Sequence, residues 1–394
     1  MFGSGAVNPD FSQVEADARQ LDVNQPFALF YQEKRPFFTE GSDFFSSPFR
    51  VIYTRTLRDP RWGLKLSGKE GANTVGAYVV QDELTNLIFP GSQGSGAALL
   101  DRVSSGLVLR YKRDLGSRYT LGALFTDRSG DNYFNRVYGV DGMARFGRSD
   151  KMTFQLLGSS TRYPEEVALD HGQPPGTLGG HVFGAQYEHQ GRRLNGYVEY
   201  DEADLLFRAD LGFMPRVDYR ELEGGVSWSW YRDQGWWSRI QVGSSFEYSE
   251  DREGRFLYRN HSLNFFFRGA MQTFSVFYLN RSRESYGGRA YDLWSGELYT
   301  ANITQGSAIF HLNLRTFFRA ILQHVDYRYN AANYTFPVEP EERHFFSQWL
   351  FSYRLNPRTV LFLGYSDNAL GTQEYPLTRS DRTIFMKLSY SWQI

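Results

Sequence analysis

The chain has 394 residues, and its 43 lysines and arginines nearly balance its 44 aspartates and glutamates. This balance leaves no strongly basic surface, so we expect no nucleic-acid partner. The chain has no cysteine, which excludes disulfides, thiolate metal sites and cysteine nucleophiles. Aromatic residues make up 17% of it, including 33 Phe and 26 Tyr, a content that suits a protein with aromatic side chains at two membrane interfaces.

The first 49 residues differ from the rest of the chain. They lack regular alternation and carry dense charge with interspersed aromatic residues. A short helix is expected around Phe27–Glu33, ended by Pro36. We predict that residues 1–49 lie outside the barrel described below and plug its lumen. The residues expected to anchor this plug to the wall are Asn8, Asp10, Glu15, Asp17, Glu33, Lys34 and Arg35.

From about residue 50 onward, alternating segments are joined by connections that are short and long in turn. Leu107, Leu109 and Tyr111, for example, alternate with Val108, Arg110 and Lys112. Successive side chains of a strand point to opposite faces, so each segment has an apolar face and a mostly polar face. Short turns on one side and longer loops on the other are typical of outer-membrane barrels. We therefore predict an all-β fold, a transmembrane antiparallel β-barrel of about 18 strands (about 16 to 20) over residues 50–394.

The first and last strands of this barrel are expected at Val51–Leu57 and Ile384–Ile394. Closure of the barrel would pair these two strands with each other. Alternation in the last strand places Leu388, Tyr390 and Trp392 against lipid and Lys387 in the lumen.

Charged residues on the polar faces are expected to line the lumen, because basic side chains facing lipid would cost about 2–4 kcal/mol at mid-depth. The expected lining residues are Arg110, Lys112, Glu199, Asp201, Arg239, Glu247, Arg268, Arg315 and Lys387. Glu199 and Asp201 share a face, so a cation site is an alternative to a role in the lumen lining.

Catalytic, cofactor and metal sites are not expected. The histidines lack the paired spacing of a helical zinc site. A hydrolase remains a minor alternative, because Ser347 lies near His344 in the sequence and nucleophilic catalysis needs such groups together.

Two blocks near the N-terminus resemble a known family. They are Asn8–Asp17 (NPDFSQVEAD) and Glu33–Phe38 (EKRPFF), followed by Glu40–Gly41. Leu64–Lys69 and Ala209–Arg216, with Asp218–Arg220, also resemble it. The family is an outer-membrane barrel domain of unknown function, DUF5916, which usually follows a carbohydrate-binding module of the family 9 type. The resemblance implies the barrel fold and no settled activity.

Together these patterns predict a channel in the bacterial outer membrane for small hydrophilic solutes, restricted by the N-terminal segment. The alternative is a closed barrel that anchors an upstream domain or serves as a subunit of an envelope complex. The expected partners are outer-membrane lipid, small solutes and an envelope protein or a missing upstream domain. The first residues contain no export signal, so we expect a mature or truncated form of the protein.

Overall fold

The computed structural model describes residues 2–7, 27–270, 273–286, 296–334, 337–356 and 359–390. The strands are β1 (Phe2–Val7), β2 (Pro60–Glu70), β3 (Asn73–Asp82), β4 (Thr85–Pro90), β5 (Ser95–Leu100), β6 (Ser104–Leu115), β7 (Tyr119–Gly130), β8 (Tyr133–Phe146), β9 (Asp150–Arg162), β10 (Thr177–Gln190), β11 (Leu194–Ala203), β12 (Tyr219–Tyr231), β13 (Trp237–Glu250), β14 (Phe256–Gly269), β15 (Phe274–Tyr286), β16 (Gly296–Asn313), β17 (Thr316–Tyr329), β18 (Glu341–Asn356), β19 (Thr359–Thr372) and β20 (Thr378–Tyr390). The helical pieces are short: α1 (Pro36–Thr39), α2 (Glu165–Asp170) and the 3-10 turns η1 (Ser42–Phe45), η2 (Thr54–Thr56) and η3 (Ala331–Asn333). Among the described residues, no helix is long and apolar enough to cross a membrane.

One 18-stranded sheet contains every strand except β4 and β5, which form a separate two-stranded hairpin. In the registers described, each strand pairs antiparallel with its neighbour, as β6 does with β7 and β7 with β8. The predicted all-β fold and strand number are therefore confirmed. Tight turns connect several of these strands, and Gly116 and Gly147 take the left-handed conformation there, with φ of 71° and 74°, which glycine adopts without steric cost.

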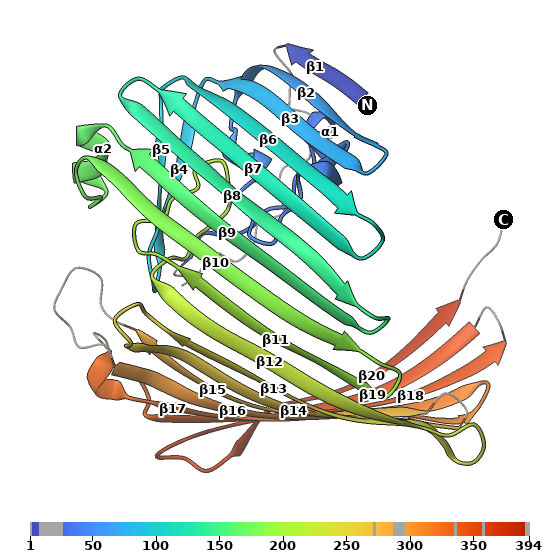
Figure 1. Cartoon of the computed structure of the whole chain (residues 1–394). Helices are drawn as coiled ribbons and strands as arrows, with labels where there is room; N and C mark the ends of the chain where they lie inside the picture. Colours follow the sequence, from blue (N-terminus) through green and yellow to red (C-terminus); the bar gives the residue numbers. More distant parts are fainter. Residues whose placement is uncertain are drawn as a thin grey trace. The chain divides into compact units, whose positions relative to one another are not determined.

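The chain divides into two compact units. Unit 1 comprises Met1–Glu188, Glu199–Leu222 and Glu250–Gly254, and unit 2 comprises His189–Val198, Glu223–Ser249 and Arg255–Ile394. In unit 1, α1 lies on the concave side of the sheet, behind β2 and β3 in the view of Figure 1. We call residues 27–59 the N-terminal segment, and the face of β2, β3 and β6–β9 that packs against it the inner face.

Three expectations for the start of the sheet are wrong. Val51–Leu57 forms no strand and instead contains η2, because the carbonyl oxygens of Thr54 and Leu57 accept hydrogen bonds from Arg35. The strand predicted there is replaced by β1, which pairs with β2 from Phe2↔Ser67 to Val7↔Trp62. Residues 2–7 thus belong to the sheet and not to a plug, and the predicted pairing of the last strand with Val51–Leu57 does not form.

The predicted helix at Phe27–Glu33 is also wrong. Residues 28–35 are not helical, and α1 begins at Pro36 where a helix was expected to have ended. Proline fits the first turn of a helix because its missing N–H would have no partner there. The connection between β3 and β6 folds as the hairpin of β4 and β5.

In unit 2, β14–β20 follow one another as antiparallel neighbours. Cross-strand partners share a face, so one face carries the apolar row Phe310, Phe318, Phe351, Leu363 and Met386. Lys387 lies on the opposite face of β20, paired with Phe362, and is exposed. Trp392 and Ile394 lie outside the described residues.

Candidate functional site: a filled inner face

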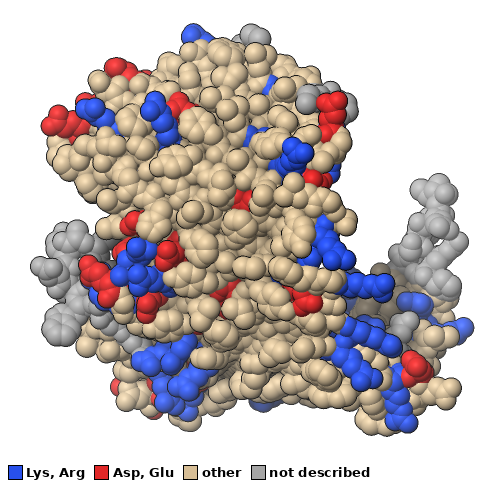
Figure 2. Space-filling view, in the orientation of Figure 1, with Lys and Arg blue, Asp and Glu red and all other residues tan. Residues whose placement is uncertain are grey.

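In the strands of unit 1, apolar side chains are exposed and polar side chains are buried, the reverse of the usual pattern. On β6, Leu109 and Tyr111 are 43% and 42% exposed, while Arg110 between them is 2% exposed. On the face of unit 1 seen in Figure 2, charged side chains gather mainly near the strand ends. This arrangement is the one expected of a β-barrel in a bilayer, whose strands turn apolar side chains outward to lipid and polar side chains inward.

The inner face is polar along several strands. Its buried polar side chains include Lys65, Ser67, Arg110, Thr126, Arg128, Asn135, Asp141, Gln155, Ser159 and Thr161. Arg110 donates to both carboxylate oxygens of Asp141 on β8, at 2.5 and 2.8 Å. The paired charges satisfy each other, as buried charges must.

The N-terminal segment is folded around Arg35. This buried guanidinium donates to both oxygens of Glu33, at 2.9 and 2.7 Å, and to the carbonyls of Leu57 and Thr54. Burial alone would raise the pKa of Glu33, but the bonds and charge of Arg35 and the Thr54 hydroxyl hold it below its ordinary value. The expected wall anchors Glu33 and Arg35 thus bond within the segment, and Lys34 is exposed. Asn8, Asp10, Glu15 and Asp17 lie outside the described residues.

Other residues join the segment to the wall. Lys65 on β2 donates to the carbonyls of Phe37 and Glu40. Lys112 on β6 donates to the Ser46 hydroxyl at 3.0 Å, and the Arg110 guanidinium reaches the Ser46 carbonyl at 3.3 Å.

Further hydrogen bonds hold the segment at Phe49 and at its C-terminal end. The Phe49 N–H donates to Gln155 on β9 at 2.7 Å. The carboxylate of Asp82 on β3 accepts the N–H groups of Arg58 and Asp59 at 2.9 and 2.6 Å. Side chains of the inner face therefore hold the segment from Phe37 to Asp59.

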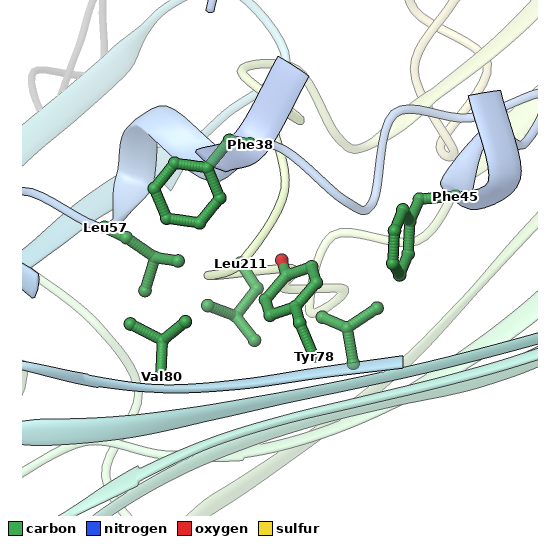
Figure 3. Close-up of a cluster of buried hydrophobic side chains, with 7 residues drawn as sticks. Phe38, Phe45, Leu57, Tyr78, Val80 and Leu211 are labelled. Carbon is green, nitrogen blue, oxygen red and sulfur yellow. The ribbon is translucent and has the colours of Figure 1, made fainter. Parts of the chain in front are cut away.

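An apolar cluster lies between the segment and the wall (Figure 3). Its buried members are Phe38, Phe45, Leu57, Tyr78, Val80, Val108 and Leu211. Tyr78, Val80 and Val108 come from β3 and β6, whereas Phe38 and Phe45 come from α1 and η1. Burial of such side chains stabilises by about 1.5–3 kcal/mol each, so apolar packing reinforces the polar contacts.

The loop between β11 and β12, residues 204–218, also folds onto the inner face. Its Asp210 carboxylate accepts hydrogen bonds from the hydroxyls of Tyr133 and Tyr163, at 2.7 and 3.1 Å. The backbone N–H of Asp210 donates to the side-chain oxygen of Asn135 at 2.9 Å. Burial raises the pKa of Asp210, although these hydroxyls and Arg128 act in the opposite direction. In the sequence, only the resemblance of Ala209–Arg216 to DUF5916 singled out this loop.

The N-terminal segment and the β11–β12 loop are bonded to each other. The Tyr53 N–H donates to the Leu211 carbonyl, and the Phe213 N–H to the Arg50 carbonyl, each at 2.7 Å. Gly212 lies at this crossing, where a Cβ atom would approach the Val51 Cα to 2.6 Å. Both segments therefore behave as one packed body on the inner face.

The remaining residues expected in the lumen occupy several positions. Glu199 and Asp201 border a cavity of about 330 Å³ with Pro48 and Phe49, and Gln186 donates to Glu199 at 2.8 Å. On β13, Arg239 and Glu247 alternate with the exposed Val242, Phe246 and Tyr248. Arg268 is exposed at the end of β14. Arg315 does not lie on a strand as expected, because the chain turns at Leu314–Arg315 between β16 and β17.

The described residues bring together no catalytic or metal site of the kinds considered. Within the described ranges, no group of His, Asp and Glu could hold a metal ion. His344 and Ser347 lie three positions apart on β18, and therefore on opposite faces of the sheet. This pair cannot act together as a nucleophile and base.

Comparison with known proteins identifies one family at the N-terminus. The model of the Domain of unknown function (DUF5916) matches residues 5–64. The resemblance inferred from the N-terminal blocks is thereby confirmed over these residues. No curated protein matches the chain.

Several solved structures are similar to the chain at low identity. OccAB2 of Acinetobacter baumannii is 11% identical with a TM-score of 0.38, over 84% of this chain and 91% of that one. OccK7 (OpdD) of Pseudomonas aeruginosa is 12% identical with a TM-score of 0.37, over 84% and 90%. The outer-membrane expressed OmpT of Vibrio cholerae is 10% identical with a TM-score of 0.32, over 83% and 100%.

Proposed function

We propose that this chain forms a transmembrane β-barrel of the bacterial outer membrane. The observation that carries the proposal is the reversed burial on β6, where Arg110 is buried between the exposed Leu109 and Tyr111. In water, such a face would leave a broad apolar surface exposed. In a bilayer, the same face is satisfied by lipid, and the polar face turns toward an aqueous interior.

The proposed activity is passage of small hydrophilic solutes through an interior restricted by the N-terminal segment and the β11–β12 loop. An 18-stranded barrel is wide enough for an aqueous channel unless something fills it. Lys65 and Lys112 donate hydrogen bonds to the segment, and Gln155 accepts one from it, which supports a fixed restriction. The polar lining favours hydrophilic solutes over apolar ones.

Single-channel recording in planar bilayers tests this activity. The wild-type protein is expected to give small, discrete conductance steps. A variant with residues 27–49 replaced by a Gly-Ser linker of the same length keeps β1 and is expected to conduct more. If neither protein conducts above background, the channel is rejected.

A closed barrel that anchors a partner is the second candidate. The buried cluster around Phe38, Tyr78 and Leu211 favours it, because apolar packing of this kind opposes release of the segment. This candidate predicts no conductance and a stable envelope protein that copurifies after mild detergent extraction.

A further inference from the structure

The apolar row of unit 2, from Phe310 to Met386, belongs to a face on which large apolar side chains are exposed. Leu263 on β14, Leu279 on β15 and Leu322 on β17 lie on this face, and all three are exposed. In the proposed barrel, such side chains contact lipid. We call this face of β14–β18 the outward face.

Two rows of mainly polar residues lie next to these apolar side chains. The first row is His261, Arg281, Asn302, Asp326 and Arg343. The second row is Arg259, Arg283, Thr300, Arg328 and Glu341. Each residue is the cross-strand partner of the next, so the members of a row share a face. Residues two apart on a strand also share a face, so Arg259, His261 and Leu263 place both rows on the outward face.

The two rows carry an excess of positive charge. Five arginines against two carboxylates leave a net charge of +3 with His261 neutral. The carboxylates lie on β17 and β18, where Asp326 is 3.6 Å from Arg328 and Glu341 is 3.7 Å from Arg343. The part of the rows on β14 and β15 contains no carboxylate. We call its four members, Arg259, His261, Arg281 and Arg283, the basic cluster.

The basic cluster brings like charges together. Arg259 is the direct cross-strand partner of Arg283, and His261 is that of Arg281. Opposed side chains have Cβ atoms about 4.5–5.5 Å apart, and like charges in such a pair destabilise the sheet. An anion between them would remove this repulsion. Phosphate suits the position, because a guanidinium group donates two parallel hydrogen bonds to it.

The basic cluster lies toward the strand ends that carry the longer connections. Residues 251–255, 287–295 and 330–340 connect the strands at this end, whereas 270–273 and 314–315 connect them at the other. The longer connections of outer-membrane barrels lie on the extracellular side. The cluster therefore lies between the apolar side chains and the extracellular loops, where lipid headgroups are expected.

We propose that the basic cluster binds the phosphate groups of a lipid of the outer leaflet. The phosphates bond to the guanidinium groups, and the acyl chains of the same molecule pack against Leu263 and Leu279. The apolar side chains beside the cluster favour a lipid over free phosphate. This inference rests on the proposed function, since the outward face must lie in the membrane.

Native mass spectrometry of the detergent-solubilised full chain tests the proposal. Lipid A supplies phosphates and acyl chains, phosphatidylcholine is the zwitterionic control, and inorganic phosphate is the free anion. We expect lipid A to bind in preference to both. The triple variant Arg259→Gln, Arg281→Gln, Arg283→Gln should weaken its binding about 10- to 100-fold, because each basic side chain beside anionic lipid contributes about fivefold.

A matched control removes three positive charges elsewhere in unit 2. Arg232, Arg315 and Arg354 are exposed and lie toward the opposite strand ends, and changing all three to Gln should leave lipid A binding unchanged. Glu341→Gln removes a carboxylate from the rows and should strengthen binding about 2- to 5-fold. Loss of the fold cannot produce this gain.

Equal binding of lipid A by the wild type and the triple variant overturns the proposal. An equal loss in the matched control does so too, and inorganic phosphate that binds as well as lipid A excludes the lipid. Conductance without a preference for lipid A removes this inference and leaves the proposed channel intact. A preference for lipid A without conductance rejects the channel and leaves the lipid site.

Discussion

Arg110 on β6 and Asp141 on β8 form a two-bond ion pair across the intervening strand β7, at 2.5 and 2.8 Å. Arg110 is almost fully buried, and its guanidinium also reaches the Ser46 carbonyl of the N-terminal segment. The two buried charges therefore neutralise each other, and Arg110 also helps to hold the N-terminal segment against the inner face.

Removing one member of this pair leaves the other charge buried without its partner. We expect Arg110→Ala to lower the free energy of unfolding by about 3–5 kcal/mol, measured by urea titration in detergent. The double variant Arg110→Met with Asp141→Leu removes both charges and should recover most of this loss. A double variant as unstable as the single one would contradict the expectation.

Asp210 should make stability depend on pH. Because burial raises its pKa in the folded state, its contribution is present below the unfolded pKa of about 3.9 and is lost as pH rises through the folded pKa. We expect the wild-type urea midpoint to fall with rising pH in this interval more steeply than that of Asp210→Asn, which cannot ionise. Asp131→Asn, in an exposed turn, is the control and should follow the wild type. If the urea midpoints of the wild type and Asp210→Asn change with pH in parallel, Asp210 does not contribute to the pH dependence of stability.

Gly212 sets the distance between the N-terminal segment and the β11–β12 loop. In Gly212→Ala the new Cβ would lie 2.6 Å from the Val51 Cα and 2.8 Å from the Arg50 oxygen, so the two backbones must separate. We expect a loss of about 1–3 kcal/mol and faster hydrogen exchange at the amides of Tyr53 and Phe213. Gly179→Ala meets nothing closer than 3.8 Å and should exchange like the wild type. Unchanged protection at Tyr53 in Gly212→Ala would show that the crossing tolerates a side chain.

The exposed apolar face provides a test of the membrane location. Leu109→Arg places a charge on that face and should cost about 2–4 kcal/mol in lipid vesicles if it lies near the bilayer midplane. Ser117→Arg adds the same charge in the exposed turn between β6 and β7 and should have little effect. Equal stability of the two variants in vesicles would argue against a lipid-facing surface.

The alternation of the wall could be predicted from sequence because it is local. The side chains of Leu109 and Arg110 point in opposite directions on any extended strand, whatever the rest of the chain does. The contents of the interior could not be predicted in this way. Arg35 was expected to bridge to the wall, but it binds Glu33, two positions away, and the carbonyls of Thr54 and Leu57, 19 and 22 positions away.

The sequence by itself determined an all-β chain of 18 strands with one apolar and one polar face, since a period of two needs only neighbouring residues. The tertiary structure decided that Phe2–Val7 and not Val51–Leu57 joins the sheet. It also decided that the β11–β12 loop folds inward and that a cavity remains beside Tyr78. These outcomes depend on partners such as Asn135 and Asp210, which are 75 positions apart, and no local pattern reports which distant groups will meet.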